Sequence, residues 1–62
     1  MNKEFIYKIC DNLIDQLTVL KGSIQLEKMN NKVDHSITIL QEVANIEKTI
    51  NELVHQLINL DN

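Results

Sequence analysis

Apolar residues recur along the first half of the chain at intervals of three and four residues. This spacing places them on one face of a helix, because an α-helix has 3.6 residues per turn. The first apolar seam consists of Ile6, Cys10, Leu13, Leu17, Leu20 and Ile24. Further apolar residues widen this face on both flanks: Phe5, Ile9, Ile14, Val19 and Leu26. The pattern predicts a helix over about residues 3–28.

The second half of the chain repeats this pattern. Its seam consists of Ile39, Val43, Ile46, Ile50, Leu53, Leu57 and Leu60. A second apolar row lies beside the seam: Ile37, Leu40, Ala44, Val54 and Ile58. We therefore predict a second helix over about residues 35–60.

The apolar repeat is interrupted once, at about residues 29–34. Asn30 and Asn31 favour turn conformations, and Asp34 or Ser36 can cap the helix that follows. A connection of about five residues makes the second helix return antiparallel to the first. The predicted fold class is all-α, with residues 1–62 forming a single antiparallel two-helix hairpin.

Both apolar faces are broader than one partner helix can cover. A chain of 62 residues also needs a partner, a metal or a disulfide to bury enough surface. We therefore predict a homodimer in which two hairpins form a four-helix bundle, although a monomer that completes its bundle on another protein would use the same surface. The predicted dimer core is Ile6, Leu13, Leu17, Leu20, Ile24, Ile39, Val43, Ile46, Ile50, Leu53 and Leu57.

Composition narrows the class of partner and the compartment. The chain has a net charge of −3, no arginine, and six lysines dispersed among nine acidic residues, so we expect no nucleic-acid partner. Its single cysteine, Cys10, lies on the apolar seam and is interpreted as a small buried hydrophobic residue. We see no signal peptide and no apolar run near the roughly 20 residues of a membrane span, so we expect a cytoplasmic protein without a membrane partner.

Residues 13–27 hold the most recognisable sequence of the chain. The run Gln16-Leu17-Thr18-Val19-Leu20-Lys21-Gly22, followed by Ile24 and Leu26, resembles the first helix of the dimerisation and histidine-phosphotransfer domain of sensor histidine kinases. Residues 43–53 resemble the second helix of that domain. Glycine is common in that family at the position of Gly22, where we expect close helix packing or a mild bend.

The resemblance also identifies a departure from the family. In the family, the phosphoacceptor histidine lies six residues before the leucine that corresponds to Leu17, and Asp11 holds that position here. The acid that follows the histidine in the family corresponds to Asn12. The polar positions that orient water correspond to Asp15 and Gln16. An aspartate cannot replace the imidazole nucleophile, and the chain contains no glycine-rich phosphate loop. We therefore expect no kinase activity, no catalytic residue and no cofactor.

Two interpretations are open for these four residues, Asp11, Asn12, Asp15 and Gln16. They form either a solvated helix face or a docking surface for a response regulator or a kinase. We favour docking, which predicts a non-catalytic regulator of bacterial two-component or phosphorelay signalling. One alternative is an aspartyl-phosphate phosphatase like the small helical-hairpin phosphatases of sporulating bacilli, whose Ser-Gln-Glu-Leu-Asp motif is only partly matched by residues 40–44. Another is a helical adaptor. His35 and His55 are expected to be solvated helix residues, and no metal site is predicted.

Overall fold

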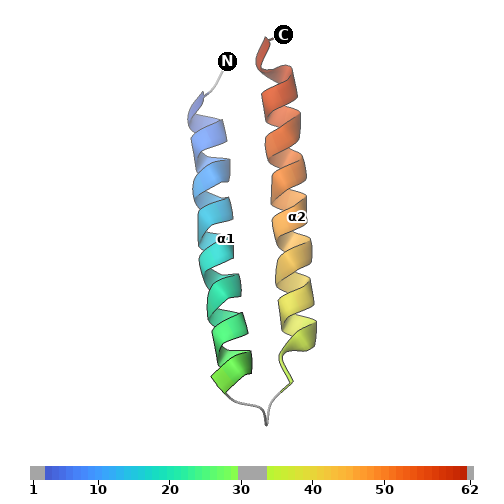
Figure 1. Cartoon of the computed structure of the whole chain (residues 1–62). Coiled ribbons are helices and arrows are strands. Elements are labelled where there is room, and N and C mark those ends of the chain that lie inside the picture. The colour runs from blue at the N-terminus through green and yellow to red at the C-terminus, as the bar shows by residue number, and fades with distance from the viewer. Residues whose placement is uncertain (1–2, 30–33, 62) are drawn as a thin grey trace.

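The protein is a hairpin of two long helices (Figure 1). The computed structural model describes residues 3–29 and 34–61. Helix α1 spans Lys3–Met29, helix α2 spans Ser36–Ile58, and a short 3₁₀ turn, η1, spans Asn59–Asp61. The predicted all-helical class with two helices is confirmed, and the described residues contain no strand.

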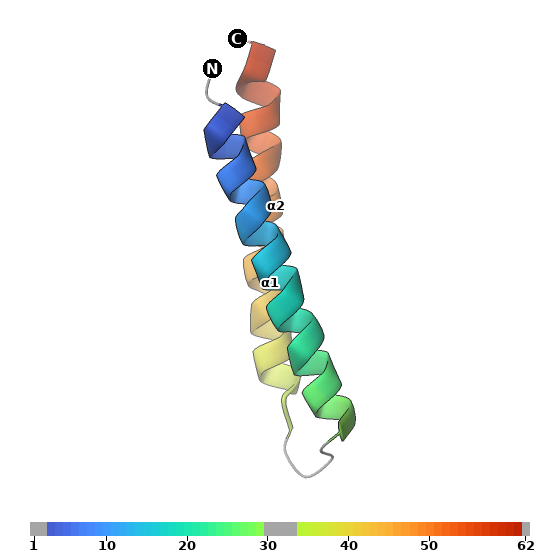
Figure 2. The same ribbon diagram turned by 90° about the vertical axis from the view of Figure 1, so that its left-hand side faces the viewer.

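The observed helices follow the apolar pattern closely. Helix α1 ends one residue beyond the expected end at 28, and helix α2 gives way to η1 before the expected end at 60. Four residues of the expected turn, 30–33, lie outside the described residues. In Figure 1 the helices run antiparallel, with both termini at one end, and in Figure 2 they are slightly inclined to each other, as is usual for packed helices.

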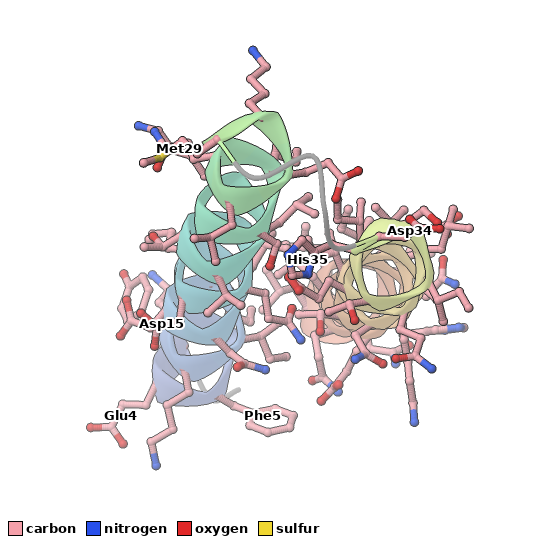
Figure 3. All side chains as sticks on the ribbon, turned by 90° about the horizontal axis from the view of Figure 1, so that it is seen from below. Glu4, Phe5, Asp15, Met29, Asp34 and His35 are labelled. Atoms are coloured by element: carbon pink, nitrogen blue, oxygen red, sulfur yellow. The ribbon has the colours of Figure 1, made fainter. Side chains whose placement is uncertain are left out.

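The start of α2 is held by two local hydrogen bonds. The Ser36 amide donates to Asp34 Oδ1 at 2.9 Å, and the His35 amide donates to Glu27 Oε2 at 2.9 Å. The hydrogen bonds from Ser36 favour the ionised Asp34 carboxylate and so hold its pKa below the usual range. The Glu27 bond joins the end of α1 to the start of α2, where Figure 3 shows His35 between the two helices.

The helices contact each other through one narrow strip on each. We call these strips the facing rows, and they contain residues that are buried or half-buried. The facing row of α1 is Ile6, Ile9, Leu13, Gln16, Leu20, Ser23 and Glu27. The facing row of α2 is Ile39, Glu42, Ile46, Thr49, Leu53 and Gln56, and it is continued by His35 before the helix and by Leu60 in η1. Only two hydrophobic side chains in the described residues are buried, Ile9 at 5% exposure and Ile46 at 7%.

Along each helix, every second residue of the facing row is also in the predicted seam, and the residues between them differ. On α1, Gln16 and Ser23 face α2, whereas the neighbouring seam residues Leu17 and Ile24 are 48% and 40% exposed. On α2, Thr49 and Gln56 are in the facing row, and Ile50 and Leu57 are 42% and 47% exposed. One helix covers a strip only about two rows wide, so the rest of each broad apolar face stays in solvent.

Gly22 does not mark a close approach of the two helices. It is half-buried, and a β-carbon added there would have no neighbouring atom within 4 Å. The close packing that we considered for this position is therefore not present within the hairpin. The remaining effect of the glycine is its low helix propensity.

Replacing Gly22 by alanine should therefore stabilise the protein. Alanine is favoured over glycine inside a helix by about 1 kcal/mol, and the space around the position is open. Urea unfolding followed by circular dichroism would measure the gain. Lys21→Ala, at the adjacent exposed position, is the control and should change the unfolding free energy by only a few tenths of a kcal/mol. A loss of stability in Gly22→Ala would contradict the open packing.

Neither helix within the described ranges combines the length and the hydropathy needed to cross a bilayer.

Candidate functional site

One side of the hairpin carries an open groove between the helices, with a volume of about 300 Å³. We call it the polar groove. It is lined by Asn12, Asp15, Gln16, Val19, Glu42 and Asn45. Three of the four predicted docking residues, Asn12, Asp15 and Gln16, are thus brought together in it. The fourth, Asp11, is exposed and lies outside this lining.

Helical periodicity explains why these residues meet. Asn12 and Val19 are seven residues apart, so they lie two turns apart on the same edge of α1. Glu42 and Asn45 are three residues apart on α2 and so lie on one edge of that helix. Gln16 belongs to the facing row of α1. Each helix therefore supplies one edge, and the facing rows form the floor.

A hydrogen bond between the helices fixes the carboxylate on the floor of the groove. The Ser23 hydroxyl donates to Glu42, with its Oγ 2.6 Å from Oε1 and 3.0 Å from Oε2. Hydrogen bonds to an ionised acceptor are stronger than those between neutral groups. Because serine is a neutral donor, this bond orients Glu42 without cancelling its negative charge. The groove therefore contains a fixed negative charge.

Gln16 occupies a different environment from the one that the sequence indicated. Its Oε1 atom is buried and accepts no hydrogen bond within the described part of the chain. A buried acceptor without a donor costs about 1–3 kcal/mol. The resemblance placed Gln16 where kinases orient a water molecule against a bound regulator. Gln16 as a whole is half-buried and contributes to the groove lining.

The other candidate groups lie apart from the groove lining. His35 is half-buried near the turn, His55 is exposed, and Cys10 is a half-buried free thiol. No cluster of three His, Cys, Asp or Glu side chains within residues 3–29 and 34–61 could hold a metal ion. Thr49 is buried, and its hydroxyl donates to the Asn45 carbonyl at 3.1 Å. None of these groups adds a reactive pair to the groove.

The opposite side of the hairpin is apolar. We call it the apolar flank, and its rows are Cys10, Leu17, Ile24, Val43, Ile50 and Leu57. In an antiparallel pair, the residues that directly precede corresponding facing-row residues lie on one side of the hairpin, as Asn12 and Asn45 do in the polar groove. The residues of the apolar flank lie on the other side. None of these six residues is charged, and Lys3 continues the α1 row one heptad toward the N-terminus. Next to it, Ile14, Leu40 and Val54 are 59%, 67% and 45% exposed.

Sequence reasoning missed Val19, Glu42 and Asn45 as groove residues, and it missed the bond between Ser23 and Glu42. Polar residues recur every seven positions in the facing rows, at Gln16 and Ser23 on α1 and at Glu42, Thr49 and Gln56 on α2. The exposed row of Glu4, Asp11, Thr18 and Gln25 has the same spacing, so this repeat does not single out the rows that meet.

Comparison with protein-family models, with curated proteins and with solved structures gave no match. The hairpin itself presents a polar groove on one side and an apolar flank on the other.

Proposed function

We propose that this chain is a non-catalytic regulator of bacterial two-component or phosphorelay signalling. In this proposal two hairpins associate through their apolar flanks into a four-helix bundle, and each polar groove binds a response regulator or a sensor kinase. The supporting observation is the grouping of Asn12, Asp15 and Gln16 in the polar groove, on the side of the hairpin opposite the apolar flank. One face thus serves assembly and the other serves recognition.

The direction of the apolar flank favours the bundle. In a square four-helix bundle each helix contacts two neighbours that lie about 90° apart around its axis. At 100° per residue, Leu17 lies about 70° around α1 from the direction of α2. A second hairpin at that angle would cover Leu17 and Ile24, which are 48% and 40% exposed in the single hairpin. The polar groove would remain on the outside.

The residues at the predicted docking positions favour binding without catalysis. The kinase domain that this chain resembles carries a histidine and an acid at the positions of Asp11 and Asn12, and neither replacement is a phosphate acceptor of that type. Residues 40–44 lack the aspartate of the small phosphatases' motif, which disfavours the phosphatase alternative. A hairpin of this kind would occupy a docking face and slow phosphotransfer between authentic partners.

A reconstituted kinase and regulator pair, taken from the same genome, tests the proposal. Added protein should slow phosphotransfer in proportion to its concentration, while taking no label itself from radioactive ATP. Asp15→Arg should weaken this inhibition, because it reverses a charge at the groove. Gln16→Ala should leave inhibition nearly unchanged.

Glu4→Arg makes the same charge reversal at an exposed α1 residue outside both the groove lining and the apolar flank, and it should inhibit like the wild type. Loss of regulator phosphate at substoichiometric protein, abolished by Gln16→Ala, would show a phosphatase instead. If no regulator or kinase binds, the helical adaptor is the better description.

A further inference from the structure

We infer that the polar groove takes an amphipathic helix of the partner, with apolar residues against the α1 edge and a lysine or arginine above Glu42. This inference rests on the proposed function, because it names the chemistry of the partner at the same site. The two edges of the groove differ in character, and its floor carries the Glu42 carboxylate.

The α1 row along the groove is apolar except at Asn12; Phe5 and Leu26 extend it beyond the groove lining, and Asp15 lies beside it. Phe5, Val19 and Leu26 recur on it at multiples of seven residues and are 42%, 58% and 57% exposed. Asn12 is the only polar member of this row. From Phe5 to Leu26 the row covers about 32 Å at 1.5 Å per residue. A partner helix of roughly 20 residues could therefore lie along it.

The α2 edge is polar. Across the groove from the α1 row of Asn12 and Val19 lies a row of exposed residues: Thr38, Asn45, Glu52 and Asn59. Amide and hydroxyl groups in such a row can hydrogen-bond to the polar side of an incoming helix. An apolar edge opposite a polar edge matches a helix whose two sides differ in the same way, rather than one that is apolar all round.

Charge complementarity selects a cationic residue on the partner. Glu42 holds its negative charge on the floor, oriented by Ser23, and Asp15 adds a second carboxylate to the lining. The lining contains no lysine or histidine. An arginine or lysine placed there would bind a preoriented carboxylate in a partly desolvated setting.

The apolar flank does not compete for this helix. Its six named residues carry no charge, and in the proposed bundle they are covered by the second hairpin. Each dimer would therefore present two equivalent grooves on its outside.

A display selection with the intact protein tests this inference. The probe is a library of 20-residue amphipathic helices with a constant leucine face and four flanking positions randomised. Selection against the wild type should enrich lysine and arginine at these positions about fivefold over selection against Glu42→Gln, which keeps an acceptor for Ser23 but removes the charge. Glu47→Gln, a neutralisation outside the groove lining, should give the wild-type enrichment.

Two results would overturn the inference: equal enrichment on the wild type and Glu42→Gln, or selected peptides whose amide chemical-shift changes map to Leu17 and Ile50 instead of Val19 and Asn45. Its failure is distinct from failure of the proposed function. Concentration-dependent inhibition of phosphotransfer without basic enrichment would keep the regulator and reject the cationic helix. Enrichment of basic residues without any effect on phosphotransfer would keep the cationic helix and reject the regulator.

Discussion

Replacing Leu17 or Ile50 by aspartate is expected to convert a dimer into a helical monomer. Both side chains belong to the apolar flank and are 48% and 42% exposed in the single hairpin, so a carboxylate there remains hydrated while the hairpin is alone. In the four-helix bundle the same carboxylate would be buried without a partner, which costs several kcal/mol. Sedimentation at micromolar concentration would report a dimer for the wild type and a monomer for each variant.

Ile37→Asp provides a matched control on α2. Ile37 is 71% exposed and lies outside both the facing rows and the apolar flank, so this variant should remain dimeric. A wild type that sediments as a stable monomer would contradict the bundle. So would a Leu17→Asp variant that stays dimeric with unchanged affinity, because the apolar flank could not then be the interface.

Replacing Ile46 by alanine should cause a large loss of hairpin stability. Ile46 is 7% exposed and is one of two buried hydrophobic residues among those described. Truncating a buried isoleucine to alanine costs about 2–5 kcal/mol, and we expect about 2 kcal/mol because a two-layer hairpin can partly close around the space. That is a large fraction of the roughly 3–5 kcal/mol that the core of so small a domain supplies.

Urea unfolding at several protein concentrations would measure this loss and separate it from dimer dissociation. Ile37→Ala removes the same atoms from a residue that is 71% exposed and should cost less than about 0.5 kcal/mol. If the two variants lose the same free energy, Ile46 is not at the contact between α1 and α2. A larger loss in Ile50→Ala than in Ile46→Ala at low concentration would show that the predicted seam, rather than the facing row, packs inside the hairpin.

The sequence by itself determined the elements of this fold. Apolar spacings of three and four residues define two helices, and the asparagine-containing interruption separates them. The structure agrees, with α1 at Lys3–Met29 and α2 at Ser36–Ile58. Local propensity and amphipathic periodicity depend only on neighbours along the chain, so they could be read without knowing the packing. The grouping of Asn12, Asp15 and Gln16 on α1 follows from the same periodicity.

Only the tertiary structure decided which strip of each broad face meets the other helix. A helix with Leu13, Gln16 and Leu17 can turn either of two rows toward a neighbour: the row through Leu13 and Leu17, or the row through Leu13 and Gln16. Both rows are continuous along the helix because it has 3.6 residues per turn. The choice of Gln16 brought Ser23 to Glu42 across a separation of 19 residues and placed the polar groove opposite the apolar flank. That contact depends on the relative rotation of two helices, a quantity that a one-dimensional pattern does not contain.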